Sequence, residues 1–215
     1  KHVTRELPRG GKVLVLNTGA IIGPEAVAML QALHSRSIGG IEEHLKKLAE
    51  KGPEKFMSQF YVGYNHKSIG DCGDATIFIE GVSMLVAKAI QDWPLYSGQE
   101  SSTRFIDFST QKFIDPLGRE ESDFILESWR VLYLHGLEML IHHLNKRFPK
   151  QSDEKSEAYD KAIKARAFDV MRGFLPAGAS TNLAWHSNLR QIADKLLVIR
   201  HHPLEEVRAT ALAIE

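Results

Sequence analysis

The feature that most constrains the fold of this chain is a long helical pattern between residues 119 and 148. Apolar residues recur there at a spacing that places them on one stripe of a helix. Pro149 follows directly and closes the helix, because proline cannot donate the next backbone hydrogen bond. We therefore expect this segment to be the clearest helix of the chain. The stripe consists of Ile125, Trp129, Leu132, Leu140 and Leu144.

The rest of the sequence predicts shorter helices and two strands. The run at 12–16 is rich in β-branched residues and the run at 74–83 alternates, which favours strands in both places. Gly39-Gly40 and Pro94 interrupt the helical patterns. Ser152 and Asp153 are candidate caps for a helix with an acidic first turn. The predicted class is α+β and mostly helical, with further helices at 24–35, 41–51, 53–63, 83–91, 152–174, 187–200 and 203–214.

Composition excludes several classes of protein. The chain of 215 residues has 27 lysines and arginines and 27 aspartates and glutamates. This balance does not indicate non-specific electrostatic binding to nucleic acid or to an anionic membrane. Cys72 is the single cysteine, which rules out an intramolecular disulfide and a thiolate zinc site. No apolar run reaches the roughly 18 residues needed to span a bilayer. Without a visible signal peptide, a reducing cytoplasm is the expected location.

We expect residues 1–215 to form one domain. The chain starts without Met and stops at Glu215 inside a predicted helix, which favours a segment of a longer or tandem polypeptide.

No familiar catalytic or metal signature is present. The sequence lacks a P-loop, a dinucleotide fingerprint, G-x-S-x-G and H-E-x-x-H. Two adjacent histidine pairs occur, His142-His143 and His201-His202. Neighbouring residues on a helix point about 100° apart, so neither pair forms a natural metal clamp. We expect surface or capping histidines and no metal site.

Four arginines lie near helix ends or turns: Arg104, Arg172, Arg190 and Arg200. The guanidinium group is a planar fork of donors that matches a phosphate or carboxylate bidentately. Taken alone, each arginine is compatible with an anion site or with a surface salt bridge. Composition cannot show whether the four converge.

Three ordered segments resemble the flavin-dependent thymidylate synthases. The first, NHKSIGDCGDATIFIEGVS at 65–83, resembles the family's G-H-x-S segment and the strand and helix start that follow it. The second, DWPLYSGQESSTRF at 92–105, lies where the family has R-H-R-x-x-S-x-N/Q-E-x-S-x-R-Y/F. The third, MRGFLPAGASTNLAWHSNLRQIADKLLVIR at 171–200, resembles R-x-x-L-P … N-x-R … L-R. The resemblance runs from about residue 12 to the end, and it implies that family's fold, a small mixed sheet flanked by long helices.

The resemblance also implies roles for individual residues. The matching positions that bind deoxyuridylate (dUMP) are Glu100, Ser102, Arg104, Arg172 and Arg200. The positions that lie near the flavin, FAD, are His66, Ser97, Gln99, Asn188 and Arg190.

The family's chemistry is methylation of dUMP to dTMP. Methylenetetrahydrofolate gives the carbon, reduced flavin gives the hydride and NADPH is the co-substrate, so no catalytic cysteine is needed. Its members are homo-oligomers, tetramers in the family, with active sites between subunits.

The sequence departs from the family pattern at three places. Asp92-Trp93-Pro94 replaces the R-H-R triplet, Asp71-Cys72 replaces a Glu-His, and Ala89 stands where the family has a glutamine. A carboxylate about 5 Å from a phosphate repels it by roughly 1–3 kcal/mol at intermediate dielectric. Two interpretations remain open: a copy that works only beside another subunit or tandem domain, or a homologue that binds a nucleotide, or serves as a structural partner, without methylating.

Overall fold

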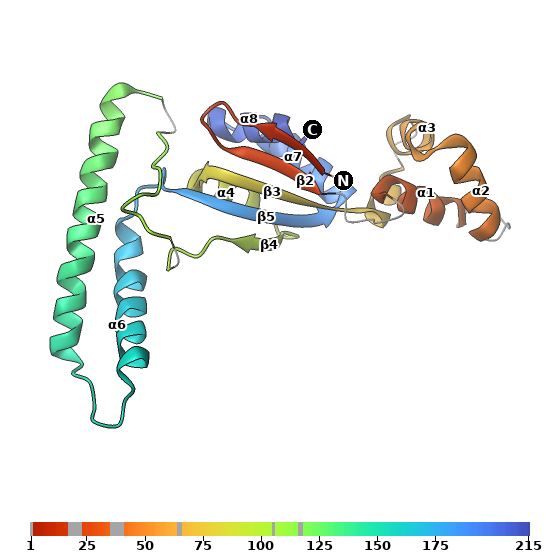
Figure 1. Ribbon diagram of the computed structural model, residues 1–215. Helices are drawn as coiled ribbons and strands as arrows, with labels where there is room; N and C mark the ends of the chain where they lie inside the picture. The colour runs from red at the N-terminus through yellow and green to blue at the C-terminus, as the bar shows by residue number, and fades with distance from the viewer. Residues whose placement is uncertain (1, 17–22, 35–40, 64–65, 105, 116–117) are drawn as a thin grey trace.

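A five-stranded sheet forms the centre of the computed structural model, which describes residues 2–16, 23–34, 41–63, 66–104, 106–115 and 118–215 (Figure 1). The strand order is β1-β2-β3-β5-β4, and all four pairings are antiparallel. The α+β class is thus confirmed, with an antiparallel sheet in place of the mixed one we expected. The strands are β1 (His2–Glu6), β2 (Lys12–Leu16), β3 (Asp74–Ser83), β4 (Ser97–Glu100) and β5 (Ser180–Asn188).

The helices fall into three groups around this sheet (Figure 1). One group covers a face of the sheet and consists of α4 (Met84–Gln91), α7 (Leu189–Ile199) and α8 (Glu205–Ile214). A second, at one end, consists of α1 (Pro24–His34), α2 (Ile41–Lys51), α3 (Pro53–Phe56), η1 (Met57–Gly63) and η2 (Lys67–Cys72). The third, at the opposite end, consists of α5 (Glu120–Arg147), α6 (Ser156–Met171) and the short η3 (Arg172–Phe174).

The main core lies between the sheet and α4, α7 and α8. Ile79 and Trp185 project from β3 and β5 and are fully buried against Ile90, Ile199 and Val207 of the three helices. The alternation along β5 explains this, because every second residue faces the helices. The opposite face of the sheet carries half-buried or exposed residues, among them Thr76, Phe78, Asn182 and His186.

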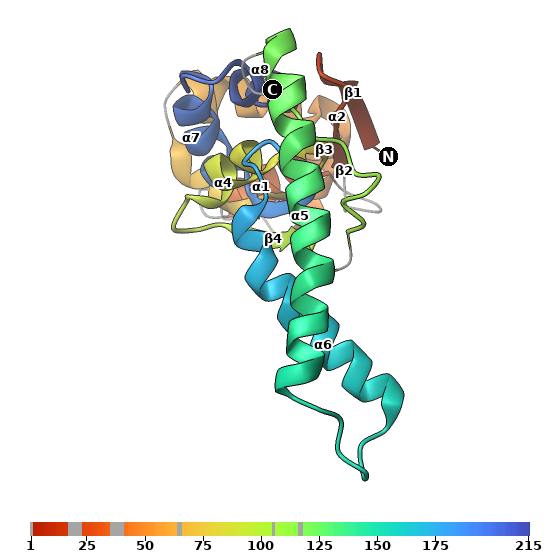
Figure 2. The same ribbon diagram turned by 90° about the vertical axis from the view of Figure 1, so that its left-hand side faces the viewer.

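The helices α5 and α6 form an antiparallel hairpin that extends away from the sheet (Figure 2). Tyr133 and Met171 pack with Phe108 and Phe113 where the hairpin joins the sheet. Arg130 fixes the neighbouring loop, since its Nη1 donates to the carbonyl oxygens of Phe108 and Gln111 at 2.5 and 2.7 Å. The hairpin is therefore anchored near the middle of α5 and at the C-terminal end of α6.

Most predicted elements are confirmed, with small shifts at their ends. The long helix spans Glu120–Arg147 and the strands at 12–16 and 74–83 are present. The predicted helix at 152–174 begins later, at Ser156 after Lys155, so Ser152 and Asp153 do not cap it. Ser35, Gly39, Gly40, Asn65 and Phe105 lie outside the described residues.

Three strands were not predicted, and one of them is central. Residues 180–188 form β5 between β3 and β4. Its buried positions include Thr181 and Ser187, which hid the apolar alternation from the sequence pattern. The strands β1 and β4 are short edge strands of mostly polar residues, which carry a weak strand signal.

Candidate functional site

Two of the predicted arginines meet at one carboxylate. Arg104 donates from Nε and Nη2 to the two carboxylate oxygens of Asp169, at 3.0 and 2.5 Å, in a bidentate fork. Arg172 lies on the same acid, with its Nη1 3.5 Å from Asp169 Oδ1. The hydrogen bond from Arg104 lowers the pKa of Asp169 below its ordinary value, and the same contact raises the pKa of Arg104. Two guanidinium groups facing one carboxylate leave an excess of positive charge there.

Ser102 and Glu100 precede Arg104 on the same segment. The Ser102 hydroxyl accepts weakly from the Arg104 backbone N–H at 3.4 Å. Gln91 Nε2 donates to Glu100 Oε2 at 2.8 Å, which fixes that carboxylate against α4. No sequence pattern indicated Gln91 or Asp169, because each contact joins residues that are separated along the chain.

Two shallow cavities flank this segment. One, of about 280 Å³, lies beside Arg104 and is lined by Asp107, Phe108 and Tyr133 among others. Burial raises the pKa of Tyr133, whose hydroxyl has no hydrogen-bond partner within the described structure. The second, of about 270 Å³, includes Glu100 and the open face of the sheet. A larger cavity of about 800 Å³ lies at the tip of the α5–α6 hairpin and contains none of the predicted residues.

Three of the predicted cofactor residues, Asn188, Arg190 and His66, lie toward the other end of β5. Asn188 caps α7, because its Oδ1 accepts from the Gln191 backbone N–H at 2.9 Å. Arg190 pairs with Asp71 of η2 at 2.7 Å, so one departure from the family pattern supplies its partner. Arg190 Nε and Asp71 Oδ1 are buried and lack a hydrogen-bond partner among the described residues. His66 is exposed at the start of η2, with its ring 6.4 Å from that of Phe60.

Ser97 and Gln99 lie on the edge strand β4. Their register partners on β5 are His186 and Ala184. Both side chains are exposed, and His186 Nδ1 is 3.0 Å from Thr76 Oγ1 on the same open face. These two predicted residues therefore lie on a polar part of the sheet surface.

The Asp92-Trp93-Pro94 segment packs against α7. Trp93 Nε1 donates to Gln191 Oε1 at 3.0 Å, and Lys195 Nζ donates to the Asp92 carbonyl at 3.2 Å. The same ammonium group lies 5.4 Å from the centre of the Trp93 ring. Burial lowers the pKa of Lys195, which is only 4% exposed. This replacement of R-H-R has its own network of contacts.

Arg200 stands apart from both groups. It ends α7 and pairs with Glu215 at 3.3 Å, next to the end of α8. The chain thus brings Arg104 and Arg172 together and leaves Arg200 with a different acid.

Two of the predicted residues, Arg172 and Asn188, lie toward opposite ends of β5. Asn188 ends β5, whereas Arg172 lies on the segment that leads into its start at Ser180 (Figure 1). Strands rise about 3.4 Å per residue, so the nine residues of β5 separate its ends by roughly 27 Å. Arg172 and Asn188 are therefore well separated in one copy of the chain, whereas Gln99 and Glu100 are neighbours on β4.

Two further observations concern metal ions and membranes. Within its described part, no three His, Cys, Asp or Glu side chains form a group that could hold a metal ion. No described helix is both long enough and apolar enough to cross a bilayer.

Comparison with known proteins assigns the chain to a family. A model of the thymidylate synthase complementing protein family matches residues 21–215. A UPF0159 protein of Chlamydia pneumoniae is 24% identical over 208 residues, and one of Chlamydia muridarum is 26% identical over 204. Each match covers 88% of this chain and 38% of the relative, so the chain spans well under half the length of these curated relatives. The family match covers most of the chain and agrees with the three motif segments, and the chain therefore belongs to the thymidylate synthase complementing protein family, the flavin-dependent thymidylate synthases.

Proposed function

We propose that this chain supplies the nucleotide-binding half of a thymidylate synthase-type site, with dUMP as its ligand. The observation that carries the proposal is the convergence of Arg104 and Arg172 on Asp169. A nucleotide phosphate is a dianion with the geometry that a guanidinium fork recognises. It would take the place of Asp169 as the partner of these two arginines.

Neighbouring groups would orient the rest of the nucleotide. Ser102 offers a hydroxyl next to Arg104, and Glu100 is held by Gln91 as an acceptor for the base or sugar. Both donors and acceptors are needed to recognise a pyrimidine edge. Arg200 would bind the nucleotide only after its ion pair with Glu215 is broken.

The residues of this chain do not fit a flavin by themselves. In the family, bound flavin provides hydride for the methylation. The two cations near the Asn188 end of β5 already have partners within this chain. Arg190 forms an ion pair with Asp71, and Lys195 is buried beneath Trp93. Arg190 Nε and Asp71 Oδ1 are buried beside this ion pair, and about two thirds of each side chain is covered. We therefore derive no step through FAD on this chain.

Methylation would require a second contributor to the site. Reacting atoms must approach to about 3–3.5 Å, whereas Asn188 ends β5 and Arg172 precedes its start, and the two ends of β5 are roughly 27 Å apart. Another copy of the chain, or a tandem domain beside this single domain of residues 1–215, would bring the missing groups. In that assembly FAD, NADPH and methylenetetrahydrofolate would serve as in the family, in the cytoplasm.

A second candidate is a catalytically degenerate homologue that acts as a nucleotide-binding or structural partner subunit. The contacts of Trp93 with Gln191 and of Lys195 with the Asp92 carbonyl favour it, because they fill the position of the R-H-R triplet. Both candidates share nucleotide binding, and they differ in whether an added flavin is retained.

Calorimetric titration with dUMP and with deoxyuridine tests the proposal. We expect wild-type protein to prefer dUMP, and Arg104→Ala to weaken dUMP binding roughly tenfold while leaving deoxyuridine unchanged, because a charged hydrogen-bond partner is lost. Arg5→Ala, at an exposed arginine of β1, is the matched control. Equal dUMP affinity in wild type and Arg104→Ala would show that the site is assigned to the wrong residues.

A further inference from the structure

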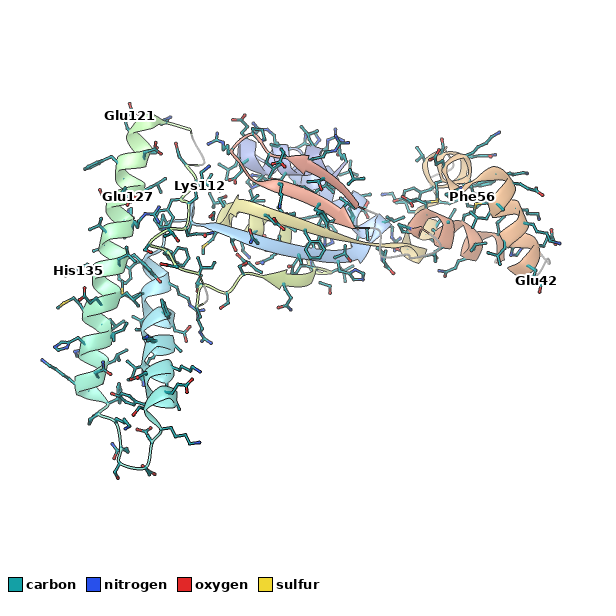
Figure 3. The ribbon with its side chains drawn as sticks, in the orientation of Figure 1. Glu42, Phe56, Lys112, Glu121, Glu127 and His135 are labelled. Carbon is teal, nitrogen blue, oxygen red and sulfur yellow. The ribbon has the colours of Figure 1, made fainter. Side chains whose placement is uncertain are left out.

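The cavity of about 800 Å³ at the tip of the α5–α6 hairpin has no role in the proposed function. It lies beyond His135 along α5, where the hairpin stands clear of the sheet (Figure 3). Its walls are the end of α5, the loop at 148–155 and one side of α6. Cavities of roughly 300–1,000 Å³ are the size that proteins use to hold small molecules. The tip of the hairpin therefore has room for a ligand.

Positive charge is concentrated around this cavity. Arg147, Lys155 and Arg166 line it, together with a single acid, Glu154. Residues 145–166 contain seven lysines and arginines and four acids, whereas the charges of the whole chain are balanced. An excess of one sign within a cavity attracts a ligand of the opposite sign.

The three cations of the cavity form no ion pair with a carboxylate in the part of the chain that the structure describes. The ion pair in this part of α6 joins Lys161 to Glu157, and neither residue lines the cavity. The acid that does line it is held within the loop, because Glu154 Oε2 accepts from the Gln151 backbone N–H at 2.8 Å. The positive charge is therefore available to a bound anion.

An aromatic ring orders two of these cations without using their hydrogen-bond donors. The guanidinium carbons of Arg166 and Arg147 lie 4.4 and 5.6 Å from the centre of the Phe148 ring. A ring face attracts a guanidinium group electrostatically, so the N–H groups stay free for an anion. The backbone of Phe148 is fixed in turn, since its carbonyl oxygen lies 2.9 Å from the Tyr159 hydroxyl. The anion-binding groups are thus partly ordered before a ligand arrives.

The rest of the lining is mostly apolar. A bare inorganic ion would leave these side chains in contact with water, whereas a ligand with an apolar body would cover them and gain the free energy of burial. The apolar lining consists of Pro149, Ala158, Ala162 and Ile163, with the rings of Phe148 and Tyr159.

We propose that this cavity binds a small organic anion with an apolar body, such as an aromatic or acyl carboxylate, sulfonate or phosphate monoester. Its anionic group lies among Arg147, Lys155 and Arg166, and its apolar body covers the apolar lining. The inference goes beyond the proposed function and is independent of it, because neither Arg104 nor Arg172 lines this cavity.

Fluorescence titration with anilinonaphthalene sulfonate tests the proposal. The probe is an aromatic anion whose emission rises when it binds apolar surface, and phenylnaphthylamine is its uncharged analogue. We expect saturable binding of one sulfonate per chain. Arg166→Met removes a charge and keeps an apolar stem, so it should weaken sulfonate binding about tenfold and leave the uncharged analogue unchanged.

Two further variants decide whether the probe occupies this cavity. Lys164→Met is the matched control, because Lys164 is an exposed cation of α6 that does not line the cavity. Ala162→Phe fills the cavity without changing its charge and should weaken both probes. Circular dichroism checks that each variant keeps its helices. Equal sulfonate affinity in Arg166→Met and Lys164→Met, or unchanged binding of both probes to Ala162→Phe, would overturn the proposal.

Competition tests the class of ligand. Octanoate should displace the bound sulfonate, whereas inorganic phosphate at the same concentration should not, because it has no apolar body. Equal displacement by phosphate would show that charge alone is recognised and would contradict the proposed class. Arg104→Ala should keep the sulfonate affinity of wild type, so failure of this site and failure of dUMP binding are separate results. A tenfold loss in Arg104→Ala would instead place the probe in the nucleotide site.

Discussion

Replacing Glu206 with alanine should destabilise the chain strongly, although Glu206 lies on a terminal helix. Its carboxylate is 5% exposed and connects α8 to the end of β3. Glu206 Oε1 accepts from the Ser83 backbone N–H at 2.9 Å, and Oε2 accepts from the Ser83 hydroxyl at 2.6 Å. That hydroxyl in turn accepts from Val86 N at 3.3 Å as the N-cap of α4. One carboxylate therefore holds a strand end, a helix start and α8 together.

The magnitude follows from the groups that lose their partner. Ser83 is fully buried, so Glu206→Ala leaves a backbone N–H and a hydroxyl without an acceptor. Each unsatisfied buried donor costs about 1–3 kcal/mol. We expect a loss of roughly 3–5 kcal/mol in the free energy of unfolding, a large share of the 5–15 kcal/mol typical of a domain.

Urea unfolding followed by circular dichroism measures this loss. Glu205→Ala is the matched control, because Glu205 is the preceding residue, its side chain is 69% exposed, and its ion pair with Arg9 is 3.5 Å long. We expect the control to cost about 0.5 kcal/mol. If Glu206→Ala costs no more than Glu205→Ala, the reasoning about buried unsatisfied groups is wrong here.

Two further predictions concern the segment at 92–100. Burial lowers the pKa of Lys195, so the unfolded chain binds more protons than the folded chain between that lowered value and about 10.5, and the free energy of unfolding must rise with pH across this window. Wild type should therefore gain stability relative to Lys195→Met between pH 7 and pH 10, as measured by urea titrations. A stability difference that stays constant with pH would argue against burial as the cause. Gly98→Ala should lower the melting temperature and detach β4 from β5, because a Cβ at Gly98 would stand 1.9 Å from the Ala184 carbonyl oxygen. Gly173→Ala is the control and should leave the melting temperature nearly unchanged, because a Cβ there meets no atom within 4 Å. Equal melting temperatures for the two variants would contradict the pairing of β4 with β5.

The sequence predicted helices better than strands, for a physical reason. A helix of the length of α5 shows its period within one segment, and Pro149 marks its end. The strand β5 is stabilised by pairing with β3 and β4, and the polar residues Thr181 and Ser187 occupy buried positions in it. Local pattern cannot reveal a strand whose partners lie far away in the chain.

The residues of the candidate site were likewise predictable from the sequence only in part. Motif resemblance located Arg104 and Arg172, but Asp169, 65 residues beyond Arg104, joins them only through the fold. The same holds for Gln91 beside Glu100. The Asp92-Trp93-Pro94 replacement was visible in the sequence, whereas its contacts with Gln191 and Lys195 depend on how the segment after α4 lies beside α7.

Equilibrium dialysis of the purified chain against FAD and labelled dUMP tests the central claim most directly. Bound dUMP is counted by its label and bound flavin by absorbance near 450 nm. We predict that the chain alone retains dUMP and shows no stoichiometric flavin band. A stoichiometric flavin complex, or the absence of bound dUMP, would contradict a chain that holds the nucleotide through Arg104 and Arg172 and lacks a flavin site of its own.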